Sequence, residues 1–219
     1  MHRLMMTSCT YQQTSTVTPR LEQLDPGNRL LSRMPLRRME AEELRDTLLW
    51  VAGQLDETRF GPAETVKVRS DGLVLSGKRR SIYVQQLRKQ PPSLLESFDL
   101  PAMNPNCLQR SESLVAPQAL HLLNDTAVRE MAAQFADRVL QVAGDEPVQQ
   151  VQRIHWTALS RPPSAEEQDA CLQMLAKLTE KWTAQLEATG KPSYPEAARK
   201  ALTTLCHTVM NSAVFLYID

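Results

Sequence analysis

The stretch TAVREMAAQFADRVLQVA, residues 126–143, repeats apolar side chains every three or four positions. That spacing places them on one face of an α-helix. The face consists of Val128, Met131, Phe135, Val139 and Val142. Asn124 or Asp125 can cap the start of this helix, and Gly144 suits its end. The stretch therefore predicts a helix with one buried side.

The rest of the C-terminal half repeats this pattern. Helical spacing recurs over 147–159 and 165–188, and again from Pro195 to the end of the chain. Ser164 and Glu167 have the spacing of a capping box, in which each side chain bonds the backbone of the other residue. Short polar connections favour antiparallel neighbours, so we expect residues 126–219 to form an antiparallel helical bundle.

The first half is more varied. Residues 40–55 predict a helix with Leu44, Leu48, Val51 and Leu55 on its buried face. Residues 62–90 instead alternate β-branched and polar side chains around Asp-Gly and Ser-Gly turns, which is typical of short strands. The sequence therefore predicts a mainly α fold, a helical bundle with a small β-hairpin insertion near residues 65–88. We divide it into an N-terminal region, 1–125, and the bundle, 126–219, within one continuous domain.

The segment LVAPQALHLLND, residues 114–125, joins these two regions. Pro117 suits the first turn of a helix because its missing N–H has no partner there. We expect Leu114, Leu120 and Leu123 to face the core and His121 to be half-buried. Met1, Met5 and Met6, near the start of the chain, are expected to fill gaps in a core.

Composition excludes several classes of protein. Lys plus Arg and Asp plus Glu each number 25, so the net charge is zero, without the basic excess that nucleic-acid binding favours. The glycine-rich phosphate-binding motifs are absent from the sequence. The four cysteines form no Cys-x-x-Cys pair and the four histidines show no ligand spacing, so no metal site is predicted.

The chain shows no pattern of membrane insertion or export. No apolar run approaches the roughly 18 residues of a membrane span. The start, MHRLMMTSCTYQQ, lacks the apolar core of a signal peptide. We therefore expect no membrane span and no signal peptide in this chain.

Several longer phrases point to a family. They are HRLMMTSCTYQQ, NRLLSRMPLRRMEAEELRDTLLWVAGQLD, RRSIYVQQLRK, LLESFDLPAMNPNCLQRSESLVAPQALHLLND, ALSRPPSAEE and LCHTVMNSAVFLYID. Together they resemble the C-terminal PSD-type domain of unknown function in large secreted planctomycete proteins. In those proteins the domain follows a cytochrome-c-like domain.

This resemblance implies an extracytoplasmic location and partners among the upstream domains of the same protein. It also implies that the chain is truncated at its N-terminus. Haem would belong to an upstream domain, so no cofactor is expected in this chain.

A polar set within the same phrases is the candidate ligand site. It consists of Arg79, Arg80, Tyr83, Asp99, Arg110, Ser113, Gln118 and Asn124. Arg79, Arg80 and Tyr83 are expected on a strand, and the other members on the following loop and helix. Arginine forks can bind sulfate or carboxylate. The same residues can instead brace a long loop, through an Asp99–Arg110 pair and capping by Gln118 and Asn124.

Two function classes follow. The first is a binding or interdomain scaffold domain, with an anionic polysaccharide as the most concrete ligand. The alternative is a polysaccharide-active or redox-coupled enzyme with its site in the 79–124 set. Pairing of His121 with Cys107 or Ser113 would give a nucleophile, but neither pair has the local signature of a known hydrolase.

Overall fold

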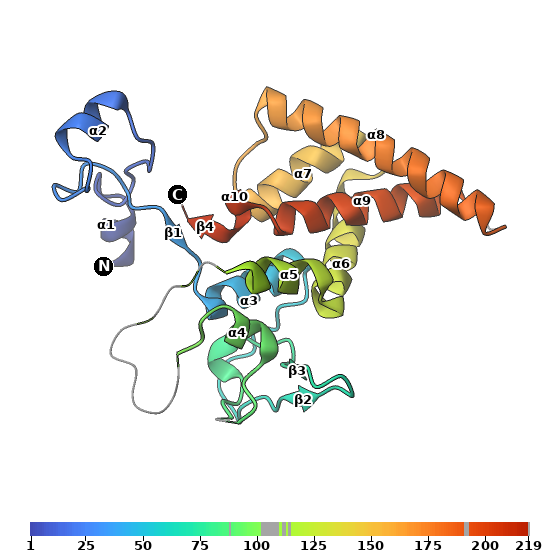
Figure 1. Cartoon of the computed structure of the whole chain (residues 1–219), viewed down its shortest axis with the longest axis horizontal. Helices are drawn as coiled ribbons and strands as arrows, with labels where there is room; N and C mark the ends of the chain where they lie inside the picture. The colour runs from blue at the N-terminus through green and yellow to red at the C-terminus, as the bar shows by residue number, and fades with distance from the viewer. Residues whose placement is uncertain (88, 102–109, 111–112, 114, 191–192, 219) are drawn as a thin grey trace. The chain divides into compact units, whose positions relative to one another are not determined.

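The computed structural model describes the chain except residues 88, 102–109, 111–112, 114, 191–192 and 219. Ten α-helices and two two-stranded sheets lie in the described part of the chain, which confirms a mainly α fold with a small hairpin (Figure 1). Contacts divide it into two compact units. Unit 1 is Met1–Met39 with Leu216–Asp219, and unit 2 is Glu40–Phe215. The predicted boundary after residue 125 falls inside unit 2.

Unit 1 brings distant parts of the chain together. It contains α1 (His2–Met6), α2 (Pro19–Leu24), β1 (Arg37–Arg38) and β4 (Tyr217–Ile218). β1 pairs antiparallel with β4, Arg37 opposite Ile218 and Arg38 opposite Tyr217. After α2 the Asp25 carboxylate accepts hydrogen bonds from the backbone N–H groups of Arg29 and Leu30, at 2.7 and 3.0 Å. These bonds fix the turn that follows the helix.

The N-terminal methionines were predicted wrongly. Met1, Met5 and Met6 are exposed rather than packed in a core. The physical reason is that α1 has only five residues and buries none of their side chains.

Unit 2 begins with α3 (Ala41–Val51), on which Leu44, Leu48 and Val51 are buried as predicted. Gly53 follows at φ +69°, a conformation that suits glycine and ends the helix. Arg138 donates to the carbonyls of Trp50 and Val51 at 2.8 and 3.1 Å. These bonds satisfy carbonyls at the end of α3 that have no partner within the helix.

The β insertion is shorter than the sequence predicts. β2 (Lys67–Val68) and β3 (Val74–Leu75) form an antiparallel hairpin with Val68 opposite Val74. Arg79, Arg80 and Tyr83 are not on a strand, because the chain turns there into a 3₁₀ helix, η1 (Ser81–Tyr83). Backbone bridges pair Arg79 with Asp56 and Val84 with Glu64, so this segment contacts the loop before the hairpin.

The remaining α-helices follow α3 in the chain. They are α4 (Ser93–Ser97), α5 (Ala116–Asn124), α6 (Thr126–Ala143), α7 (Pro147–Leu159), α8 (Ala165–Ala188), α9 (Tyr194–Met210) and α10 (Ala213–Leu216). α9 packs along both α8 and α6, as Figure 1 shows for α8 and α9. Phe135, Ile154 and Leu202 are fully buried in this core. The predicted bounds of 126–143, 147–159 and 165–188 are confirmed.

The buried face of α5 differs from the predicted one. Gln118 and Leu122 are buried, whereas Leu120 and Leu123 are 55% and 45% exposed. Leu114 lies outside the described residues. Because residues four apart share a helix face, burial of Gln118 places Leu122 inside and turns Leu120 outward. Val142, in the last turn of α6, is also exposed.

None of the described helices combines the length and apolarity needed to cross a membrane.

The predicted capping box at the start of α8 is present. Ser164 Oγ accepts from the Glu167 N–H at 3.1 Å, and the Glu167 carboxylate accepts from the Ser164 N–H at 2.8 Å. Arg161 adds two hydrogen bonds to the same carboxylate, at 2.7 and 2.6 Å. The bonds from Arg161 and Ser164 lower the pKa of Glu167 to about 2.

Glu167→Gln is expected to destabilise unit 2 at neutral pH by up to about 1 kcal/mol, since both partners are partly exposed. A carboxyl whose pKa is lowered on folding stabilises the protein above its unfolded pKa. The effect should therefore be complete above about pH 4.5 and lost as the pH falls towards about 2. Urea denaturation at neutral pH and near pH 2 measures it. Glu166→Gln, an exposed carboxylate in the same turn, is the control, and an equal loss at both pH values would contradict the expectation.

Candidate functional site

Arg45 joins α3 to the segment after the hairpin. Its side chain points from α3 into the protein, and the residue is only 3% exposed. Nε donates to Ser76 Oγ at 2.6 Å, and Nη2 donates to the Gly77 carbonyl at 2.6 Å. Nη1 donates to the Arg79 carbonyl at 2.8 Å and to Ser81 Oγ at 3.1 Å. Burial lowers the pKa of Arg45, but the Asp46 carboxylate, 3.0 Å away, opposes that shift.

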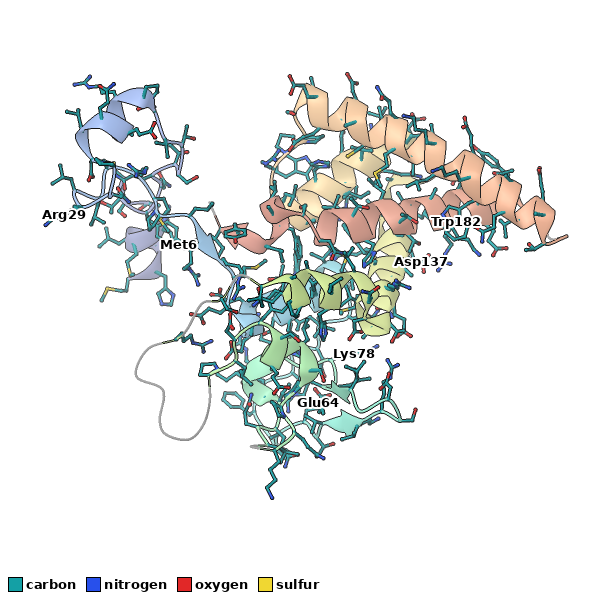
Figure 2. The ribbon with its side chains drawn as sticks, in the orientation of Figure 1. Met6, Arg29, Glu64, Lys78, Asp137 and Trp182 are labelled. Atoms are coloured by element: carbon teal, nitrogen blue, oxygen red, sulfur yellow. The ribbon has the colours of Figure 1, made fainter. Side chains whose placement is uncertain are left out.

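Glu64 holds the same segment from its other side. Its carboxylate accepts from the backbone N–H groups of Lys78 and Arg79, at 3.3 and 3.1 Å. Glu64 and Lys78 accordingly lie close together in Figure 2. A side chain at Gly77 would overlap the Glu64 carboxylate, so glycine is needed for this close approach.

A pocket of about 420 Å³ opens beside this segment, within unit 2. It lies between α3, the β2–β3 hairpin, the start of α4 and the first half of α6. Its apolar lining includes Leu49, Val74, Leu75, Leu94, Val128 and Met131. Its volume is within the roughly 300–1,000 Å³ typical of small-molecule sites, and apolar walls with few polar groups are common to such sites.

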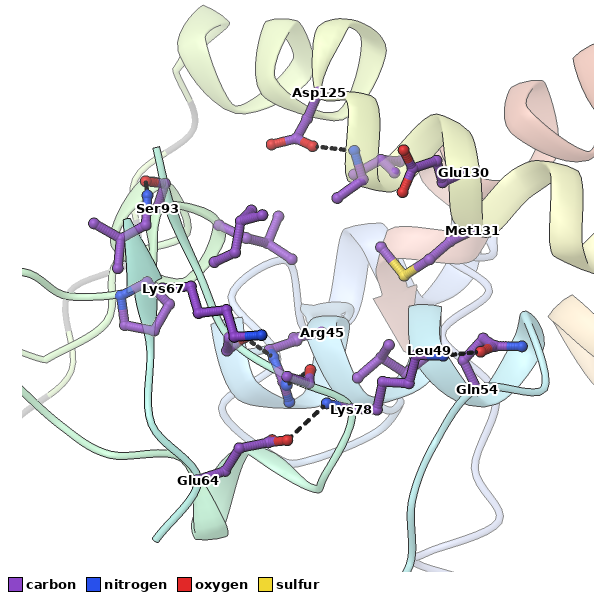
Figure 3. A pocket seen from close by; sticks show the side chains of 18 of the residues that line it. Arg45, Leu49, Gln54, Glu64, Lys67, Lys78, Ser93, Asp125, Glu130 and Met131 are labelled. Atoms are coloured by element: carbon purple, nitrogen blue, oxygen red, sulfur yellow. Dashed lines mark hydrogen bonds between the residues drawn. The ribbon is translucent and has the colours of Figure 1, made fainter. Parts of the chain in front are cut away.

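Charged side chains of both signs stand at the edge of this pocket. Lys67 and Lys78 come from the hairpin region and Glu130 comes from α6, and all three residues are exposed. Figure 3 shows Met131 between Glu130 and Leu49, with Lys67 and Lys78 reaching the pocket from the hairpin side. Lys78 Nζ also donates to Gln54 Oε1. Lys67 and Lys78 thus approach the pocket from the hairpin side, where Glu64 also lies, and Glu130 approaches it from α6.

A chain of polar groups begins in one wall of the pocket, where His121 and Asp125 are lining residues. His121 Nδ1 is 3.0 Å from Ser97 Oγ, and its Nε2 is 3.2 Å from the Asp125 carboxylate. Asp125 also caps α6 by accepting from the Ala127 N–H at 2.6 Å. The bond from His121 is the main reason that the pKa of Asp125 is lowered. Ser97 Oγ donates to the Ser93 carbonyl at 2.8 Å, and Ser97 is not part of the pocket lining.

Asp99 is the centre of a second cluster. Its carboxylate accepts from the Ser113 N–H at 2.8 Å and from Ser113 Oγ at 2.7 Å. The amide of Gln118, a residue that is 4% exposed, donates to Ser113 Oγ at 3.1 Å and approaches Asp99 at 3.3 Å. Asp99 has φ +65°, which a carboxylate bonded to nearby backbone tolerates. The cluster ties the end of α4 to the start of α5.

Arg110 is bound elsewhere. Its guanidinium donates to both Glu42 oxygens, at 2.8 and 3.0 Å, and lies 3.2 Å from Glu40. Although burial opposes the shift, the bonds and charge of Arg110 hold the pKa of Glu42 below its ordinary value. The predicted Asp99–Arg110 pair is replaced by these ion pairs at the start of α3.

With this geometry established, the chain can be compared with known proteins. The model of the PSD1 family, described as a protein of unknown function (DUF1553), matches residues 1–175. The chain belongs to this family. No curated protein and no solved structure matches the chain.

In this PSD1 member the predicted polar set does not form one site. Asp99, Ser113 and Gln118 are together. Arg79 donates to the carbonyls of Thr58, Phe60 and Pro62, and its guanidinium lies 4.4 Å from the centre of the Tyr83 ring.

The other members lie apart from these groups. Arg80 pairs with Glu57 at 3.0 Å. Asn124 is exposed at the end of α5, and Asp125 provides the cap. Cys107 lies outside the described residues. None of the eight predicted site residues lines the pocket.

The residues that do line it were missed for two reasons. Arg45 shares a helix face with Ala41 and Leu49, and a cation on an otherwise apolar face is a signal that could have been found. Lys67, Lys78 and Glu130 read as ordinary solvated charges in the sequence. Only the fold brings them to one opening.

The histidines of unit 2 each have a ring nitrogen bonded to a protein group. His155 is buried and its Nδ1 bonds the Val151 carbonyl at 2.9 Å, while His207 Nε2 bonds the Leu122 carbonyl at 3.0 Å. His121 is held by Ser97 and Asp125. Across the described ranges, no group of three or more His, Cys, Asp or Glu side chains is placed to hold a metal ion.

Arg45→Met is expected to cost about 3–5 kcal/mol, because Asp46 and the buried acceptors lose their donor. Arg45→Lys should recover only part of this, since one ammonium cannot reach the acceptors that the planar guanidinium bonds. Urea denaturation followed by circular dichroism measures both losses. Arg59→Met, at an exposed arginine, is the matched control. Equal stability of the Arg45→Met and Arg59→Met variants would show that the hydrogen bonds of Arg45 do not stabilise the protein.

Asp125→Ala and Asp125→Asn separate the two roles of this carboxylate. Asparagine can still cap α6, so Asp125→Ala is expected to be the less stable variant by about 0.5–2 kcal/mol. The difference in stability between wild type and Asp125→Asn measures the contribution of the negative charge. Because the pKa of Asp125 is lowered on folding, this difference should shrink progressively as the pH falls below about 4 and the carboxylate becomes protonated. Thermal unfolding at neutral and acidic pH measures both effects. Equal stability of the two variants would disprove the capping role.

Proposed function

We propose that this chain is a binding and interdomain scaffold domain of a larger protein, and that its ligand is an anionic polysaccharide. The supporting observation is the contrast between two sets of basic residues. The guanidinium groups of Arg45, Arg79 and Arg110 are bonded to protein groups. Lys67 and Lys78 are exposed beside an open pocket, and among the described residues the one hydrogen bond of their ammonium groups is that from Lys78 to the Gln54 side chain.

The internal bonding of the predicted polar set favours a scaffold over an enzyme. An enzyme in that set would need Asp99 and Arg110 to converge on one substrate. Asp99 instead accepts from Ser113, and Arg110 clamps Glu42. Both contacts join segments that are distant in the sequence, which is the role of a structural brace.

The two lysines favour an anionic ligand. An ammonium group forms charge-assisted hydrogen bonds with carboxylate or sulfate oxygens. Arg80, whose side chain is 53% exposed, lies two positions after Lys78 and adds positive charge. Repeated acidic sugars would present several anionic groups to such an edge, and multiple weak contacts then add to the affinity.

The proposed setting is an extracytoplasmic protein in which another domain carries haem. The absence of a Cys-x-x-Cys pair from the sequence supports a separate location for haem. The partners of this chain would then be the upstream domains of the same protein.

Thermal unfolding with sulfated, carboxylated and neutral polysaccharides tests the proposal. An anionic polysaccharide at ten times its Kd should stabilise the chain by about 1.4 kcal/mol and raise Tm by about 3–6 °C. A Lys67→Ala/Lys78→Ala variant should lose this shift. Lys177→Ala/Lys181→Ala removes the same charge from α8 and should keep it.

Arg110→Ala separates bracing from binding. It should lower the unliganded Tm and leave the ligand-induced shift unchanged. An equal shift with neutral polysaccharides, or a shift lost in Arg110→Ala but kept in the Lys67/Lys78 variant, would refute the proposed site.

A further inference from the structure

The interior of the pocket does not match an unsubstituted sugar. Leu49, Val74 and Val128 are buried and form fixed parts of its wall. Met131 is partly exposed and points into the space in Figure 3. No Trp, Tyr or Phe ring, on which a sugar could stack, is among the described residues that line the pocket. Sugar hydroxyls placed against this wall would lose hydrogen bonds to water without replacement.

The wall suits an apolar group instead. It is built from three elements, with Leu49 on α3, Val74 on β3 and Met131 on α6. Methionine is unbranched and adapts its shape to an irregular partner. An apolar group that enters releases water from this surface, which is the main source of apolar binding.

The charged residues at the edge of the pocket indicate which polar group the apolar ligand should also carry. Lys67 and Lys78 stand on the hairpin side of the opening, where an anion can approach an ammonium group. Glu64 lines the same side, but its carboxylate accepts from the backbone N–H groups of Lys78 and Arg79. Glu130, on the α6 side, disfavours a second anion there. Asp125 also lines the pocket, and its carboxylate is already bonded to His121 and to the Ala127 N–H.

We propose that the pocket binds an apolar group, such as a medium-length acyl or alkyl chain, that is attached next to an anionic group. This inference rests on the proposed function, because Lys67 and Lys78 would hold the anion in both. The ligand has two possible sources, a free amphiphilic anion or an apolar substituent on an acidic polysaccharide. The chemistry that the pocket recognises is the same in each.

Linear carboxylates from butanoate to decanoate, below their micellar concentrations, test the free form by calorimetric titration. Affinity should rise about fourfold per methylene until the pocket is full. Octyl glucoside, which carries the same chain without the anion, should bind more weakly than octanoate. The Lys67→Ala/Lys78→Ala variant should remove that advantage. Affinity that does not change with chain length would overturn the inference.

Alginate and octyl-substituted alginate test the polymer-bound form. Tighter binding of the substituted polymer would identify a polysaccharide source, and binding of octanoate with no gain on substitution would identify a free amphiphile. If both alginates bind equally and octanoate does not bind, the pocket inference fails and the proposed function stands. If only octanoate binds, the polysaccharide proposal fails and the pocket inference stands.

Met131→Trp is the blocking variant, since it fills the space that the chain would occupy. It should reduce octanoate affinity at least tenfold and leave alginate binding unchanged. If tryptophan disturbs folding, Met131→Gln, of similar volume, is the second variant. It is expected to lower the affinity for octanoate, because the buried amide would have no hydrogen-bond partner. Met174→Trp on α8 is the matched control. Octanoate affinity that is unchanged in both Met131 variants would overturn the inference.

Discussion

The structure around the candidate site depends on one buried guanidinium. Arg45 lies in α3 but bonds groups of Ser76, Gly77, Arg79 and Ser81, more than thirty positions later in the chain. The Asp46 carboxylate balances its charge and also accepts from the Ser81 N–H at 2.8 Å. A buried charge is tolerated only when it is paired and hydrogen-bonded, as it is here. The segment that carries Lys78 therefore has a fixed backbone.

A fixed backbone under exposed side chains is a useful combination for binding. The Lys78 backbone N–H is held by Glu64, while its ammonium group reaches the pocket edge. The arginines nearby have a different role, because Arg79 bonds the carbonyls of the loop that ends at Pro62. Basic residues next to each other in the sequence thus divide into members bonded to the protein backbone and members at the pocket edge. Exposure and bonding, not charge, distinguish them.

Local signals in the sequence predicted the helices well, because helices begin and end through interactions between residues that are close in the sequence. The capping box of Ser164 and Glu167 and the glycine after α6 act within a single turn of the chain. The pocket could not be predicted, since Leu49, Val74 and Met131 meet only through tertiary packing. The same limit explains the error on α5, where apolar spacing alone did not reveal that Gln118 is the buried residue. A polar side chain bonded to Asp99 and Ser113 takes the place expected for a leucine.

The pairing of β1 with β4 has a consequence for biosynthesis. Residues 37–38 leave the ribosome before α3 to α9, whereas their partners, residues 217–218, leave after all of these helices. Unit 2 can assemble during translation, but the edge of β1 stays open until then. Contacts of such long sequence separation form slowly because the intervening loop must close first. The β1–β4 pair of unit 1 therefore forms only after α3 to α9 have been synthesised.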